Sequence, residues 1–149
     1  MITVRNIFRA TLLASTVAFA GCGMMPSSMA SDTVKFGATL SGAAEVPPTN
    51  SAGTGTLVAT LDKGSSVLNW RLSFSGLTGP AVAAHFHGPA LPGANAGVVV
   101  PIPLAMTPAE GQATLTPAQV ADLTAGKWYV NVHTAAHPGG EIRGQVMVK

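Results

Sequence analysis

Residues 128–148 read W-Y-V-N-V-H-T-A-A-H-P-G-G-E-I-R-G-Q-V-M-V, and both ends of this stretch have the pattern of β-strands. In 128–133 and again in 142–148, apolar side chains alternate with polar ones, so each segment has one apolar face. Between them stand a proline and two glycines, which favour a turn. We therefore predict an antiparallel hairpin whose strands pair across residues 134–140.

Five earlier segments also have the composition of strands. The clearest is V-L-N-W-R-L-S-F-S (67–75), whose large apolar side chains at alternate positions share one face. The polar residues 62–66 before it predict a hairpin turn. The predicted strands that precede the final hairpin cover 34–40, 53–62, 67–75, 82–87 and 98–104.

One segment is predicted to be helical. Thr116 is a suitable N-cap, Pro117 suits the first helical position and Gly126 suits the C-terminal cap, so we expect one short helix over 117–125. About seven short strands with one small helix indicate an all-β fold. We predict an antiparallel sandwich or Greek-key barrel.

The first 21 residues have the features of an export signal. Arg5 and Arg9 precede an uncharged, mostly apolar stretch over 10–20 that is too short to span a membrane. The F-A-G-C sequence ending at Cys22 resembles the bacterial lipoprotein cleavage box, although phenylalanine replaces the usual leucine. Two alternatives stay open: cleavage after Ala30, or Cys22 as an ordinary residue of the apolar segment.

The predicted organisation is a signal peptide (1–21), a tether (22–33) and one β domain (34–149). We expect export to the bacterial cell envelope, in the periplasm or on the outer surface, with the lipid bilayer bound through acylated Cys22. Removal of the leader leaves six basic and six acidic residues, so charge does not support nucleic-acid binding. A lone cysteine leaves no internal disulfide, so the core alone must stabilise the domain.

All four histidines lie in two short segments. His85 and His87 share one face of a predicted strand, His133 lies on the polar face of the final hairpin, and His137 lies in its turn. Neutral imidazoles bind transition metals, and three of them could share one ion if their ring nitrogens lie within about 5 Å of one another. The sequence does not show whether the two strands are neighbours.

The metal hypothesis assigns copper, with zinc as the second choice, because copper heads the affinity order for nitrogen ligands. The ligands would be His85, His87 and His133, with His137 or water in the fourth position. Polar neighbours would orient the imidazoles through their other ring nitrogens. Alternation places these neighbours on the outward face of the hairpin: Asn131, Glu141 and Arg143, together with Tyr129 and Gln145.

A purely structural interpretation explains the same residues. Outward histidine, asparagine, glutamate and arginine side chains are typical of the solvated face of an antiparallel sheet. His137 would then be an exposed turn residue, and Glu141 with Arg143 an ordinary surface pair of little energetic weight. In this interpretation the domain is a metal-free structural or interaction module for an envelope protein or a glycan.

The motifs H-F-H-G-P-A, L-T-P-A-Q-V-A-D-L and Y-V-N-V-H-T-A-A-H-P-G-G-E-I-R-G-Q resemble those of the CHRD domain, named from the inhibitor chordin. The likeness covers roughly residues 34–149. It implies an all-β, immunoglobulin-like domain outside the cytoplasm, and it does not define a biochemical role.

A fainter resemblance is to copper/zinc superoxide dismutase. That family has an H-x-H strand, a later V-x-H and a G-G-x-I/L run, and His85, His87 and His133 occupy the three histidine positions in order. The bridging histidine, the zinc loop and the disulfide have no counterpart, so dismutase activity is not expected. No nucleophile with a base, carboxylate pair or phosphate loop indicates another enzyme.

Overall fold

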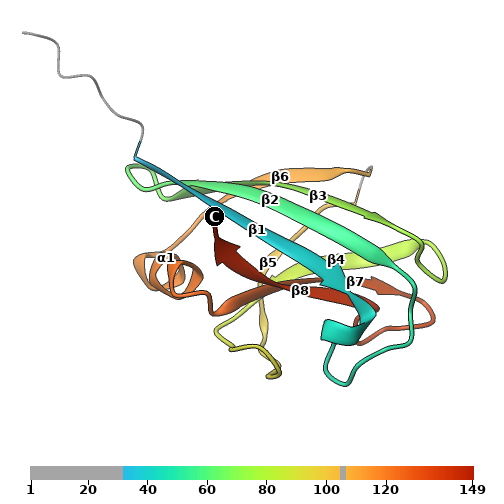
Figure 1. Ribbon diagram of the computed structural model, residues 1–149. Coiled ribbons are helices and arrows are strands. Elements are labelled where there is room, and N and C mark those ends of the chain that lie inside the picture. Colours follow the sequence, from blue (N-terminus) through green and yellow to red (C-terminus); the bar gives the residue numbers. More distant parts are fainter. Residues whose placement is uncertain (1–31, 105–106) are drawn as a thin grey trace, which may run out of the picture.

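The computed structural model describes residues 32–104 and 107–149. Residues 1–31 lie outside the described residues. They include the predicted signal peptide (1–21), Cys22 and most of the predicted tether (22–33). Eight strands, one 3-10 turn and one α-helix form the described part (Figure 1). In chain order they are β1 (Thr33–Ser41), η1 (Gly42–Ala44), β2 (Thr54–Asp62), β3 (Val67–Ser75), β4 (Ala81–His87), β5 (Val98–Pro101), β6 (Ala109–Thr114), α1 (Pro117–Thr124), β7 (Trp128–Thr134) and β8 (Ile142–Val148).

The eight strands form one sheet in the order β5-β4-β7-β8-β1-β2-β3-β6, and every neighbouring pair is antiparallel. The sheet folds over so that β1, β2, β3 and β6 form one layer and β4, β5, β7 and β8 the other (Figure 1). The prediction of an all-β antiparallel fold with one short helix is confirmed. Within the described residues no helix is long and apolar enough to cross a membrane.

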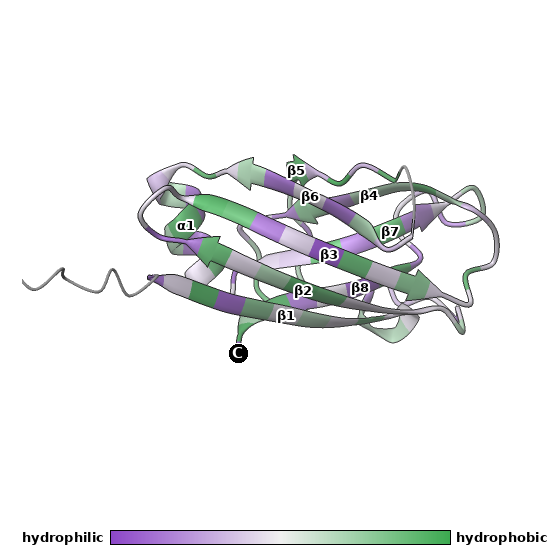
Figure 2. Cartoon of the chain, turned by 90° about the horizontal axis from the view of Figure 1, so that it is seen from above, coloured by the Kyte–Doolittle hydropathy of each residue, from purple (hydrophilic) through white to green (hydrophobic). Residues whose placement is uncertain are grey.

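Apolar and polar residues alternate along the strands (Figure 2). The buried apolar side chains of both layers form one core cluster. Trp70 of β3 packs edge-on against Phe86 of β4, with ring centroids 5.3 Å apart, and Phe86 also contacts Trp128 of β7 at 6.0 Å. The Trp70–Phe86 contact therefore joins β3 and β4, which are distant in the sheet order, whereas β4 and β7 are neighbours. Leucines that are fully buried surround the three rings: Leu40, Leu57, Leu61, Leu68 and Leu72.

The predicted hairpins are confirmed: β2 pairs with β3 across residues 63–66, and β7 pairs with β8 across 135–141. The helix begins at Pro117 as predicted and ends at Thr124. Thr116 and Gln119 form a reciprocal capping box, because each side chain bonds the other's backbone N–H.

Three details of the predicted strands are wrong. Residues 109–114 form the edge strand β6, which has no alternation of large apolar side chains to reveal it. The strand predicted over 98–104 ends at Pro101. Alternation predicts Val82 on the same inner face as Phe86 and Val148 on the same inner face as Val146. They are instead 62% and 49% exposed, since the β4–β7 register shifts near Val82 and Val148 lies at the end of β8.

Candidate metal centre

Three of the four histidines meet on the outer face of the β4-β7-β8 layer. β4 and β7 are direct neighbours, with Ala83 opposite His133 and His85 opposite Asn131. One ring nitrogen from each of His85, His87 and His133 lies within 4.8 Å of the other two. The closest contact joins His85 Nδ1 to His133 Nε2 at 3.2 Å. The structure thus brings together the three residues that sequence spacing singled out.

The face that carries these histidines is not solvated, so the predicted outward patch is wrong in this respect. Tyr129, Asn131 and Arg143 are only 2–3% exposed. They point to the expected side of the sheet, but the segment between β4 and β5 covers them and the stretch after β1 flanks them (Figure 1). Strand alternation determines the side of a sheet to which a side chain points, whereas the covering loops determine whether that side is exposed to solvent.

Backbone carbonyls set the tautomer of two histidines. His87 Nδ1 lies 3.0 Å from the carbonyl oxygen of Ala96, and His133 Nδ1 lies 3.0 Å from that of Pro138. A carbonyl oxygen only accepts, so each Nδ1 donates its proton, and each neutral ring keeps a lone pair on Nε2. Both lone pairs are then free to bind a cation.

The two Nε2 atoms converge on a third acceptor. Asn131 Oδ1 lies 3.0 Å from His87 Nε2 and 2.9 Å from His133 Nε2. His85 Nδ1 lies 3.2 Å from the same His133 Nε2. In the neutral tautomers no proton stands between these acceptors, so their close approach would be satisfied by a metal ion at their centre or by a second proton on one of the rings.

The electrostatics keep two of the imidazoles neutral. Burial lowers the pKa of His85, and the neighbouring His133 and His87 lower it further. Burial is also the main cause of the lowered pKa of His87, to which His133 and Arg143 add. Lowered pKa values favour the uncharged rings that metal ligation requires.

A carboxylate that sequence reasoning missed supports Asn131. Glu45 follows η1 and is only 5% exposed. Burial raises its pKa, while hydrogen bonds from the Val46 backbone and the Asn131 amide, with the charge of Arg143, lower it. A bond from the Asn131 nitrogen to Glu45 leaves Oδ1 facing the histidines. Glu45 and Asn131 share no sequence pattern, because only the pairing of strands brings them close together.

Gly140 makes this approach possible. Its φ is +129°, and a Cβ built there would lie 2.3 Å from Glu45 Oε1 and 2.8 Å from the Asn131 side-chain nitrogen. No other residue type leaves room for the carboxylate beside the amide. The second glycine of the P-G-G-E run thus supports the site.

Two residues predicted for the site lie elsewhere. His137 is half-buried in the turn between β7 and β8, where it lines a separate cleft of about 370 Å3, and it is not in the three-histidine group. Glu141, expected outward beside Arg143, is fully buried. Its carboxylate accepts hydrogen bonds from Ser51 Oγ, Thr134 Oγ1 and both the N–H and Oγ1 of Thr78.

Glu141 is therefore a structural carboxylate. Burial by itself would raise its pKa, but the hydrogen bonds from Ser51, Thr134 and Thr78 outweigh burial and lower the pKa to about 2. The prediction of a surface pair with Arg143 is wrong. In the described structure no hydrogen bond joins Glu141 to an imidazole.

Arg143 acts on the site through an aromatic ring. Its guanidinium carbon lies 3.4 Å from the centroid of Tyr129, and His87 stacks in parallel on the same ring at 4.7 Å. Because β7 lies between β4 and β8, Tyr129 is held between the cation and the imidazole. The Tyr129 hydroxyl also contacts the N–H and carbonyl of Ala96, the residue that binds His87 Nδ1. This stack fixes the plane of the His87 ring.

The family model of the CHRD domain matches residues 36–146. The chain belongs to the CHRD domain family. The match spans almost the whole described fold, including β4 and β7, so the three histidines lie inside the CHRD domain. No curated protein and no solved structure matches the chain, and the lipoprotein and superoxide dismutase likenesses gain no support.

Proposed function

We propose that this CHRD domain is a binding module that holds a transition-metal ion through His85, His87 and His133. The observation that carries the proposal is the convergence of one ring nitrogen from each of the three histidines. In His87 and His133 the proton is on Nδ1, which donates to a backbone carbonyl, so the Nε2 lone pair is available to the ion. Asn131 Oδ1 takes the fourth position, for which His137 or water was expected. His85 is the most exposed ligand, so an ion enters from its side.

Copper fits this set best. Ligands at 90° around an ion with bonds of about 2.0 Å lie roughly 2.8 Å apart, and tetrahedral ligands lie roughly 3.3 Å apart. The contacts of 2.9, 3.0 and 3.2 Å fall between these values. A set of neutral nitrogens and an amide oxygen, with no thiolate or carboxylate, suits copper(II) and then zinc. The histidine ligand nitrogens lie at most 4.8 Å apart, so the widest pair must approach by less than 2 Å when the ion binds.

Calorimetric titration with CuCl2 tests the site. We expect one ion per chain and a loss of affinity of at least about 100-fold for His85→Ala with His133→Ala. His137→Ala is the matched control, because it removes an imidazole outside the group, and it should bind as the wild type does. Equal binding by the double variant and the wild type would contradict the proposal.

The setting we propose for this module is the bacterial cell envelope. Support comes from the basic and then apolar leader and from Cys22 in an F-A-G-C sequence. Incorporation of labelled palmitate into the wild type but not into Cys22→Ser would support the anchor. A mature chain that begins at residue 31 would contradict it.

A metal-free interaction module is the second candidate. The same imidazole contacts with Ala96 and Pro138 attach the β4–β5 and β7–β8 segments to the sheet, which is a structural role in itself. In that case His87→Ala should lower the free energy of unfolding, and copper should not change it. An increase of wild-type stability with copper concentration would exclude this candidate.

A further inference from the structure

A second site lies two strands from His85 on the same outer face. A cleft of about 450 Å3 opens over Arg143 and Gln145 of β8, and its volume is in the range of small-molecule sites. The stretch after η1 forms one wall, and Pro92 with Gly93 forms the other. The cleft does not include the histidines, but two of its residues also support the metal centre: Glu45 bonds Asn131, and Arg143 stacks on Tyr129.

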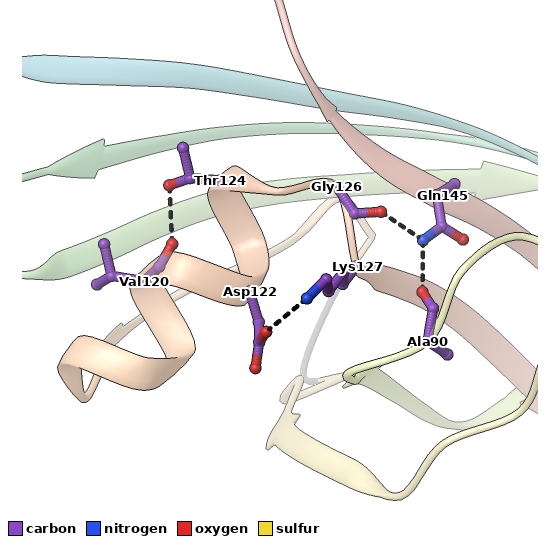
Figure 3. Close-up of polar contacts among 7 residues, drawn as sticks. All are labelled: Ala90, Val120, Asp122, Thr124, Gly126, Lys127 and Gln145. Atoms are coloured by element: carbon purple, nitrogen blue, oxygen red, sulfur yellow. Dashed lines mark hydrogen bonds and ion pairs between the residues drawn. The ribbon is translucent and has the colours of Figure 1, made fainter.

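The floor of this cleft holds an amide whose orientation is fixed. Gln145 Nε2 donates to the carbonyls of Ala90 and Gly126 at 2.9 and 2.7 Å (Figure 3). Because both partners only accept, the nitrogen must occupy this position, and Oε1 points away from both. That Oε1 is buried and has no hydrogen-bond partner.

Glu45 supplies a second acceptor in the same state. The side chain is 95% buried, since only 5% is exposed, yet Oε1 has no hydrogen-bond partner. Only one other such side-chain atom, Trp70 Nε1, occurs in the described part of the chain, and it is a donor. Both residues with orphaned acceptors therefore line one cleft. An unpaired buried acceptor destabilises the folded chain, so a ligand that donates to both atoms is favoured.

Arg143 adds donors to the cleft. Its guanidinium carries five N–H groups, and the hydrogen bonds to Ala94 and Asn95 use two of them. The charges of Arg143 and Glu45 oppose each other, so the cleft favours a ligand without net charge. The remaining walls are small and apolar, which suits the C–H face of a ring: Ala43, Ala44, Val46, Pro48 and Pro92.

We propose that this cleft binds a neutral sugar ring. These polar atoms are covered in the unliganded chain, so binding requires small shifts of the side chains that expose them to the cleft. Hydroxyl groups then donate to Glu45 Oε1 and Gln145 Oε1 and accept from Arg143, and one ring face packs against the two prolines of the walls. Hydroxyls suit the cleft because a single group can both donate and accept. A carboxylate ligand would meet Glu45, and an ammonium ligand would meet Arg143.

Saturation-transfer NMR with the methyl glycosides of glucose, galactose and mannose and with N-acetylglucosamine tests this proposal. We expect at least one of the four to bind, and Glu45→Gln to weaken it at least tenfold. The amide oxygen of the introduced glutamine must accept the hydrogen bond from Asn131. Its amide nitrogen, a donor, would then face the sugar in place of the acceptor Oε1. Ala44→Phe fills the cleft from an exposed position and should also abolish binding. Val58→Phe, on exposed β2, is the matched control.

The result that would overturn the proposal is equally definite. Absence of saturation transfer for all four sugars, or unchanged binding in Ala44→Phe, contradicts it. Copper titration of Ala44→Phe separates the two sites, because this variant should retain the wild-type metal affinity. Failure of sugar binding therefore leaves the metal proposal standing, and the reverse also holds.

Discussion

At the scale of single residues, the buried polar groups in and beside the β4-β7-β8 layer have different roles. Glu141 accepts hydrogen bonds from three neighbouring segments, whereas His87 and His133 direct lone pairs toward a common point. Strand alternation predicted that His85 and His87 share one side of their strand and that His133 lies on the polar face of the final hairpin. It could not predict their burial, because the covering residues lie far away in sequence and have no periodic pattern.

Glu141 makes stability depend on pH in a defined direction. Its pKa is about 2 in the folded protein and 4.5 ordinarily, so its contribution is complete above 4.5 and is lost as the pH falls toward 2. We expect Glu141→Gln to lower the free energy of unfolding at pH 7 by about 2–3 kcal/mol. The variant should then lose less of its remaining stability than the wild type between pH 4.5 and 2.

Urea denaturation at pH 7, 4.5 and 3 measures both effects. Glu110→Gln is the control, because its carboxylate is 56% exposed and pairs only with Arg71 at the surface. This control should follow the wild-type dependence. An acid dependence of Glu141→Gln as steep as that of the wild type would refute the structural role of this carboxylate.

At the scale of elements, the segments with strong local signals were predicted and the edges were not. The strand 67–75 shows its apolar face plainly, and the helix shows both of its caps. The edge strand β6 reads A-E-G-Q-A-T, and Trp70 packs over its Gly111, where a Cβ would lie 2.6 Å from the indole. A strand that presents a glycine to a neighbour's ring has no alternation by which to recognise it.

The helix supplies a prediction at this scale. Thr116→Ala removes the acceptor of the Gln119 N–H, so we expect it to lower the free energy of unfolding by about 1 kcal/mol in urea. Thr124→Ala is a matched change in the last turn, where the hydroxyl only bonds back to Val120 (Figure 3). Its effect should stay within about 0.5 kcal/mol. Equal losses for both variants would show that the capping box does not stabilise α1.

At the scale of the whole molecule, topology creates the candidate site. The pairing of β4 with β7 brings together histidines that are 48 residues apart, and the β1–β8 pair brings Glu45 close to Asn131. The all-β class followed from the sequence because seven of the eight strands have a local pattern of their own. The strand order did not, because apolar faces of similar composition pair equally well in several orders.

Anomalous diffraction at the copper absorption edge, from crystals of the domain soaked in CuCl2, tests the three-histidine site. We expect one anomalous peak about 2.0 Å from His87 Nε2, His133 Nε2 and His85 Nδ1, and no such peak in His85→Ala with His133→Ala. A peak only at His137, or none near the three rings, would contradict it.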